Sequence, residues 1–194
     1  MILSNCEIHK AIDEGRLVID PEPLPRRPTL GEIFCPYSTH SVDLKLHEQI
    51  RVPESGSFTI DLTRPGSLAE QITKNSEEHI LREKQPYTLE KHEFVLARTL
   101  ERIELPIVKG PPYLGARIEG KSSRSRCGLL VHFTAPTVHP GFEGTLTLEI
   151  INLGPAAFLL YPKMYIAQLI IEEVKGEITP NPSQFQGQST PEGT

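Results

Sequence analysis

The chain has no tryptophan, no long hydrophobic run and only three cysteines. Cys6, Cys35 and Cys127 are odd in number and far apart, and they include no Cys-x-x-Cys pair. This spacing excludes a disulfide framework and a zinc knuckle, and it is typical of reduced thiols in the cytoplasm. No run approaches the roughly 18 apolar residues of a membrane helix, and the first residues do not resemble a signal peptide. We therefore expect a soluble, cytoplasmic protein with no membrane contact.

Basic residues are too few for a protein that is held on DNA or RNA by a broad positive field. The 194 residues include 20 lysines and arginines against 25 aspartates and glutamates, which gives a formal net charge of -5 at pH 7. The composition therefore predicts no nucleic-acid partner. Any phosphate binding must come from a local group of cations.

Proline is abundant whereas aromatic residues are scarce. The chain has 18 prolines and 6% aromatic residues, and this balance favours short strands joined by rigid turns over long helices. A chain of this length can bury one substantial core. We predict a single, mainly β domain with extensions.

One short helix is predicted at the start of the chain. Ser4 and Glu7 have the spacing of a capping box, Ile8 and Ala11 fall on one helical face, and Gly15 ends the pattern.

Beyond this helix the pattern predicts strands, a polar insertion and a tail. Strands are expected at 17–19, 41–46 and 58–62, within 88–105, and as a set between 129 and 172. A proline-rich loop follows the first of them, and residues 64–86 form a polar insertion with one or two helical turns. The regular turns of the second half are typical of a sandwich or barrel. We predict a β domain over 1–174 and a polar, flexible tail over 175–194.

One short segment concentrates three cations and three hydroxyls: Gly120-Lys121-Ser122-Ser123-Arg124-Ser125-Arg126-Cys127-Gly128. The Ser-Ser pair could start a helical turn whose free N–H groups and hydroxyls meet phosphate oxygens. Lys121, Arg124 and Arg126 would then offset the charge of a triphosphate. The same composition also fits an ordinary solvated basic turn, and the segment alone leaves both interpretations open.

A single carboxylate, Glu149, lies inside an apolar run. If the run is a strand, Leu146 and Leu148 share one face, whereas Thr147 and Glu149 share the other, less apolar face. A half-buried carboxylate beside an arginine is either a structural ion pair or a general base. The spacing leaves both possibilities open.

The histidines do not predict a metal site. His139, just before Pro140-Gly141-Phe142-Glu143-Gly144, could be a ligand, a base or a turn residue. The remaining histidines considered show no paired spacing: His40, His47, His79, His92 and His132. The H-x-E and P-C-x-x-C elements of zinc-dependent nucleobase deaminases are also absent. We therefore expect any hydrolysis by this chain to proceed without zinc.

Six ordered motifs together resemble the dCTP deaminase branch of the trimeric dUTPase-like superfamily. The resemblance covers most of the chain, and its motifs are Ser41-Val42-Asp43-Leu44-Lys45-Leu46, Glu119-Gly120-Lys121-Ser122-Ser123 with Arg126 and Gly128, Thr134-Ala135 with Pro140-Gly141-Phe142-Glu143-Gly144, Leu148-Glu149, Asn152-Leu153-Gly154, and Ile166-Ala167-Gln168-Leu169.

The resemblance implies a distorted jelly-roll-like fold, a β-barrel or sandwich of the dUTPase-like type. It further implies a homotrimer with nucleotide sites between subunits and a C-terminal segment that closes over the triphosphate. The implied activity is zinc-independent hydrolysis of dCTP to dUTP and ammonia, in the biosynthesis of dUTP and dTTP. Mg²⁺ would arrive with the triphosphate and not on a protein cage, and dTTP is a candidate inhibitor.

The resemblance also implies roles for individual residues. Glu149 would take a proton from the water that attacks C4 of cytosine, Ser122 would hold that water, and Arg126 would orient the site and stabilise developing charge. The implied nucleotide contacts are Lys121, Ser122, Ser123, Arg124, Ser125, Arg126, His139, Thr147, Leu148, Glu149, Gln168 and Gln188.

The chain departs from the family pattern at two places. Where relatives have an aspartate before Pro-Gly-Phe, this chain has His139, which weakens a dUTPase interpretation and leaves the sugar contact open. The family's tail Tyr and Lys have no clear match in residues 180–188. Two alternatives therefore stand beside the deaminase: a dUTP diphosphatase or bifunctional deaminase-diphosphatase, and a non-catalytic nucleotide-binding regulator.

Overall fold

The described chain is built mainly of β-strands with three helices. The computed structural model describes residues 1–31, 34–56, 58–63, 67–107, 110–181, 183 and 185–194. Its helices are α1 (Asn5–Asp13), α2 (Leu68–Lys74) and α3 (Ser122–Ser125). Its strands are β1 (Val18–Asp20), β2 (Val42–Lys45), β3 (Gln49–Pro53), β4 (Ser76–Ile80), β5 (Tyr87–Leu89), β6 (Phe94–Glu104), β7 (Tyr113–Gly120), β8 (Leu129–Val131), β9 (Thr137–Val138), β10 (Glu143–Asn152), β11 (Phe158–Leu160) and β12 (Tyr165–Val174).

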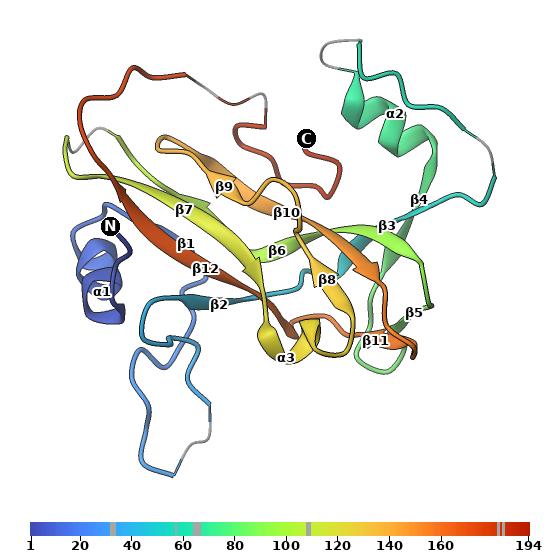
Figure 1. Ribbon diagram of the computed structural model, residues 1–194, viewed down its shortest axis with the longest axis horizontal. Helices are drawn as coiled ribbons and strands as arrows, with labels where there is room; N and C mark the ends of the chain where they lie inside the picture. Colours follow the sequence, from blue (N-terminus) through green and yellow to red (C-terminus); the bar gives the residue numbers. More distant parts are fainter. Residues whose placement is uncertain (32–33, 57, 64–66, 108–109, 182, 184) are drawn as a thin grey trace.

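These strands form two main sheets (Figure 1). One has the order β4-β3-β6-β10-β8, with β1 paired to β6, and the other has the order β2-β12-β7-β9. β5 and β11 make a separate two-stranded pair, and all the pairings between these strands are antiparallel. In the described part of the chain the sheets do not close into a barrel. The predicted dUTPase-like β fold is confirmed, with two sheets that are not closed into a barrel.

The core lies where the two main sheets face each other. Every second residue of β6 is buried, as the side-chain alternation of a strand requires. Leu148 of β10 and Leu44, Ile118 and Leu169 of the other sheet join one continuous buried cluster. Each such aliphatic side chain contributes about 1.5–3 kcal/mol by leaving water.

The predicted N-terminal helix is confirmed as α1. Ser4 Oγ accepts the Glu7 N–H at 3.4 Å, Ile8 and Ala11 are buried, and Gly15 follows the helix with a φ of +67°. The capping and termination signals therefore act where the sequence places them.

The strand predicted at 58–62 is wrong, and three observed strands were not predicted. Phe58 and Leu62 alternate as in a strand, yet they are 41% and 81% exposed and no strand forms there. An alternating pattern makes a strand only when a neighbour supplies the ladder. β3, β4 and β7 were missed; β7 is buried on both faces over much of its length, which hides any alternation.

The polar stretch 64–86 is partly helical, as predicted, and it also contributes a strand. Residues 64–66 lie outside the described residues, α2 follows them, and β4 pairs with β3 along its whole length. This segment is therefore an edge of the larger sheet. None of the described helices is long and apolar enough to cross a membrane.

Candidate functional site

A cavity of about 640 Å³ brings together β10, the loop before it and the C-terminal segment. Four of the predicted site residues line it: His139, Thr147, Glu149 and Gln188. Much of its wall is apolar and comes from Leu68, Ile72, Leu96, Ile107, Ile118, Phe142 and Phe185. A mostly apolar wall with a few converging polar groups is typical of a small-molecule site.

A β-bulge in β10 lies at the edge of this cavity. The register of β10 against β6 shifts between Thr145 and Thr147, which frees backbone groups from the ladder. The Thr99 hydroxyl accepts the Leu146 N–H at 2.9 Å, and the Gln188 carbonyl accepts the Thr145 N–H at 2.9 Å. Beyond the bulge, Thr147 and Glu149 line the cavity, whereas the side chain of Leu148 is fully buried in the core.

Glu149 forms an ion pair with His132, which follows β8. His132 Nδ1 lies 2.9 Å from Glu149 Oε2, and the same nitrogen is 3.1 Å from the Thr147 carbonyl oxygen. The other ring nitrogen, Nε2, is 2.7 Å from the Ala135 carbonyl oxygen. Both nitrogens therefore face oxygen acceptors, and this surrounding favours the doubly protonated imidazolium.

The two groups shift each other's pKa in opposite directions. Burial alone would raise the pKa of Glu149, but the adjacent His132 ring outweighs it and brings that pKa below its ordinary value of 4.5. Burial alone would lower the pKa of His132, but Glu149 and the two carbonyl oxygens raise it above 6.5. At neutral pH the carboxylate is therefore ionised, and its presence favours the protonated form of the imidazole beside it.

The buried oxygen of this carboxylate faces His132. Glu149 Oε2 is shielded from solvent, and His132 Nδ1, 2.9 Å away, also faces the Thr147 carbonyl oxygen. The Glu149 side chain as a whole is 29% exposed and lines the cavity. A half-buried carboxylate that a cation holds in a cavity wall is typical of a functional group.

The basic segment forms the helical turn that its Ser-Ser pair predicts, but it lies outside the cavity. Ser122, Ser123 and Arg126 of the α3 region are exposed to solvent. Ser125 lines a smaller hollow of about 370 Å³, and His132 lines both this hollow and the cavity. α3 therefore lies near the cavity that contains Glu149, but none of its residues lines the cavity of its own chain.

A close backbone approach fixes the turn that follows α3. Gly128 has a φ of +93°, and a Cβ there would lie 2.4 Å from the Cα of Gly154. The Leu153 N–H donates to the Gly128 carbonyl at 2.9 Å. Only glycine fits this contact between the α3 turn and the turn after β10.

Three other predicted nucleotide contacts are engaged with the chain itself. Lys121 forms an ion pair with the largely buried Asp43. Arg124 donates to a backbone carbonyl of β12 at 3.2 Å. Gln168 accepts a hydrogen bond from Ser41 at 3.5 Å. In this structure these side chains stabilise the second sheet and the base of α3.

The C-terminal segment packs back on the body. In Figure 1 it runs from the end of β12 across the molecule, and the chain ends near α2. Gln188 is 8% exposed and its Nε2 donates to the Thr145 carbonyl at 2.7 Å. A Cβ at Gly144, whose φ is +146°, would lie 2.9 Å from the Gln188 carbonyl oxygen. Of the predicted tail, residues 185–194 are thus docked on β10, while 182 and 184 lie outside the described residues.

His132 lines the cavity and pairs with Glu149, although it was not among the predicted site residues. Val131 pairs with Ile150 in the antiparallel β8–β10 ladder, so the next residues, His132 and Glu149, oppose each other. The contact depends on this register between two strands, and the spacing of histidines along the sequence does not reveal it. Across the described residues, no group of three or more His, Cys, Asp or Glu side chains is placed to hold a metal.

Comparison with known proteins places these features in context. A family model for dCTP deaminase-like proteins matches residues 2–174. The chain is 34% identical over 199 residues to the dCTP deaminase of Natronomonas pharaonis, covering 100% of this chain and 94% of that protein. It is 37% identical over 173 residues to the dUMP-forming dCTP deaminase of Corynebacterium efficiens, covering 88% and 78%.

A solved structure shares the fold. The 2'-deoxycytidine 5'-triphosphate deaminase from Agrobacterium tumefaciens superimposes with a TM-score of 0.62 at 18% identity, over 89% of this chain. The present chain spans about half the length of that protein, 48% of its residues.

Proposed function

Because the chain belongs to the dCTP deaminase-like family, we propose that it hydrolyses dCTP to dUTP and ammonia, without zinc and as a homotrimer. The observation that carries the proposal is the half-buried Glu149 carboxylate, which lines the cavity and whose pKa the adjacent His132 holds below its ordinary value.

The reaction needs a base for water and a source of protons for the leaving group. The water oxygen bonds to C4 of cytosine while Glu149 takes one of its protons. The electrons of the C4=N3 bond move to N3 as the water adds. Glu149 then returns its proton to the amino nitrogen, the bond from C4 to that nitrogen breaks, and ammonia leaves. The remaining water proton ends on N3, and C4 keeps the oxygen as a carbonyl. The sum is dCTP plus water to dUTP plus ammonia. A positioned base of this kind contributes about 10²- to 10⁴-fold.

His132 acts on Glu149 through charge. Its imidazolium keeps the carboxylate ionised in spite of burial, so the base is present in its active form at neutral pH. The ring is in turn fixed by the carbonyl oxygens of Thr147 and Ala135.

The remaining parts of the site come from a second subunit in this proposal. Ser122 and Arg126 are exposed beside α3 and do not line their own chain's cavity. Placed at the cavity of a neighbour, Ser122 holds the attacking water and Arg126 stabilises developing charge, while the N–H groups of the α3 turn meet phosphate oxygens. The cavity itself holds the base and sugar, with His139 and Thr147 at its wall. Mg²⁺ accompanies the triphosphate.

The test is product formation from dCTP and Mg²⁺ by purified protein, followed by chromatography and ammonia release. Wild type is expected to give dUTP and ammonia in equal amounts. Glu149→Gln is expected to bind dCTP and to lose at least about 10²-fold in turnover. Full activity in Glu149→Gln, or no turnover by wild type, would overturn the proposal, and binding without product would indicate a nucleotide-binding regulator.

A second candidate product is dUMP, because some relatives carry the name dCTP deaminase, dUMP-forming. In that reaction the triphosphate is also hydrolysed, and pyrophosphate appears with dUMP. His139, where an aspartate is expected, favours dUTP as the product. The same chromatogram separates the two nucleotides.

A further inference from the structure

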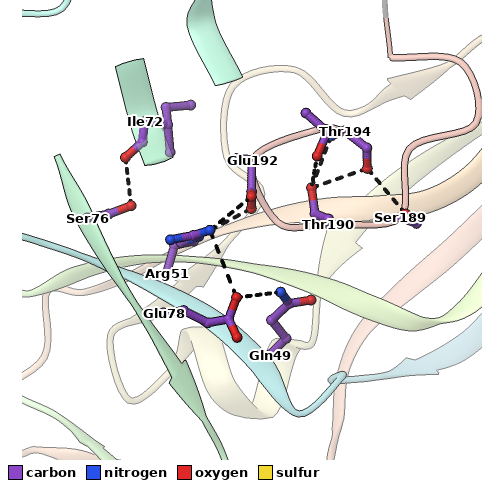
Figure 2. Close-up of polar contacts among 9 residues, drawn as sticks. All are labelled: Gln49, Arg51, Ile72, Ser76, Glu78, Ser189, Thr190, Glu192 and Thr194. Atoms are coloured by element: carbon purple, nitrogen blue, oxygen red, sulfur yellow. Dashed lines mark hydrogen bonds and ion pairs between the residues drawn. The ribbon is translucent and has the colours of Figure 1, made fainter. Parts of the chain in front are cut away.

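Arg51 of β3 lies between a carboxylate of the C-terminal segment and one of the neighbouring strand β4 (Figure 2). Its Nη2 is 3.0 Å from Glu192 Oε1 and its Nε is 3.3 Å from Glu192 Oε2, so two N–H groups meet one carboxylate. Glu78 is more distant, at 3.9 Å. The side chains of Arg51 and Glu192 are only 12% and 7% exposed, against 44% for Glu78. Glu192 is therefore the principal partner.

This ion pair borders the cavity. Glu192 lines the cavity together with its neighbour Gly193, although Arg51 does not. A bare carboxylate in the wall would repel a triphosphate, because buried like charges interact strongly. Bidentate pairing with Arg51 neutralises the negative charge of Glu192, which the C-terminal segment brings to the cavity.

Both sides of the contact are held in place. On the strand side, Gln49 Nε2 donates to Glu78 at 2.9 Å and the Ser76 hydroxyl donates to the Ile72 carbonyl at 2.7 Å, which joins α2 to β4 (Figure 2). These bonds make the β3–β4 edge a defined platform.

On the other side, the end of the chain folds into a compact turn. The N–H groups of Ser189 and Thr190 donate to the Thr194 carbonyl at 2.7 and 3.0 Å, and the Thr194 N–H donates to the Thr190 hydroxyl at 3.0 Å (Figure 2). Glu192 lies within this turn, four residues after Gln188, which binds β10. The segment is thus attached at two places, β10 and β3.

We propose that Arg51 is a positioning residue for substrate binding. By pairing with Glu192 it keeps the C-terminal segment on the nucleotide cavity, and it neutralises the carboxylate that the segment brings there. The proposal deepens the proposed function and rests on it for the identity of the substrate. It also gives the polar stretch around α2 and β4 a role, as the platform for this contact.

Steady-state kinetics with dCTP distinguish the two effects. Arg51→Gln leaves Glu192 charged and unpaired, so KM for dCTP is expected to rise at least about 10-fold while kcat changes less than about 3-fold. Glu192→Gln loses the pair without leaving a carboxylate in the cavity wall, and Arg51, which does not line the cavity, still has Glu78 at 3.9 Å. Its KM is therefore expected to rise less. The double variant is expected to match Glu192→Gln. Glu77→Gln, at the exposed neighbour of Glu78 in β4, is the control and is expected to keep the KM of wild type.

Hydrogen exchange supplies a readout that needs no substrate. In Arg51→Gln and Glu192→Gln, the amides of residues 185–194 and of Thr145 are expected to exchange at least about 10-fold faster, since both contacts of the segment weaken together. Amides of β6 are expected to stay unchanged in all variants, which excludes general unfolding. Arg51→Lys keeps the positive charge but cannot donate two hydrogen bonds side by side to Glu192. Its exchange rates for residues 185–194 are expected to lie between those of wild type and Arg51→Gln.

Two results would overturn the inference: unchanged exchange of 185–194 in Glu192→Gln, or a double variant no better than Arg51→Gln. If wild type does not deaminate dCTP but the exchange results hold, the proposed function fails and Arg51 is a docking residue only. If wild type is active and KM is insensitive to Arg51, the proposed function stands and the positioning role is refuted.

Discussion

His132→Asn tests the electrostatic arrangement at the centre of the site. Asparagine keeps a donor near the Thr147 carbonyl but carries no charge, so the ion pair with Glu149 at 2.9 Å is lost. With His132 gone, burial is the largest remaining influence on Glu149 and raises its pKa above 4.5, where the native pair holds it below. The acidic limb of kcat/KM against pH should therefore move to higher pH in His132→Asn.

The same pair predicts how stability depends on pH. The pKa of Glu149 is lowered on folding, so its contribution is present above about 4.5 and is lost as pH falls through the folded value. The pKa of His132 is raised on folding, so its contribution is complete below about 6.5 and is lost as pH rises through the folded value. The stability that wild type has over His132→Asn should therefore be greatest between about pH 4.5 and 6.5.

The assay is dCTP deamination at saturating Mg²⁺ from pH 4 to 9, with urea unfolding of each variant across the same range. His139→Asn is the matched control, because His139 also lines the cavity but no ion pair joins it to Glu149. In His139→Asn the acidic limb of kcat/KM against pH should coincide with that of wild type. An acidic limb that is unmoved in His132→Asn, or that moves equally in both variants, would refute the reasoning.

Three further predictions concern packing, hydrogen bonding and metal. Gly128→Ala should lower the free energy of unfolding by about 1–3 kcal/mol more than Gly176→Ala, because both positions have positive φ but only Gly128 would also clash, with Gly154; equal urea midpoints would contradict this. Thr99→Val should cost about 1–3 kcal/mol, since the buried Leu146 N–H loses its acceptor; a neutral effect by calorimetry would show that the bulge does not need the hydroxyl. Removal of divalent ions with EDTA should stop turnover and added Mg²⁺ should restore it, whereas a zinc-selective chelator that inhibits would count against a zinc-independent mechanism.

Local signals predicted those parts of the fold that local physics determines. Ser4, Glu7 and Gly15 define α1 through caps that require only neighbours in sequence. The alternation at 58–62 was equally regular, and it failed because Phe58 and Leu62 find no partner strand. Pairing across the sheet is a non-local property, and a period of two residues does not contain it.

The site residues, too, divide into those that local sequence predicts and those that depend on contacts between distant segments. Glu149 could be proposed from its strand and from family motifs, because its place on the less apolar face is a local property. His132 could not, since its contact depends on which residues of β8 and β10 face each other. The Arg51–Glu192 pair joins residues far apart in sequence, across the docked C-terminal segment, and no spacing rule relates them.

The contact between Thr145 and Gln188 makes detachment of the C-terminal segment cooperative. Thr145 is 7% exposed, and its N–H, carbonyl and hydroxyl all bind Gln188. If the segment leaves, these groups lose their partners together, at about 1–3 kcal/mol for each one that stays out of water. Partial detachment at this point is therefore unfavourable. The segment is docked or released as a unit, together with the part of the cavity wall that it supplies.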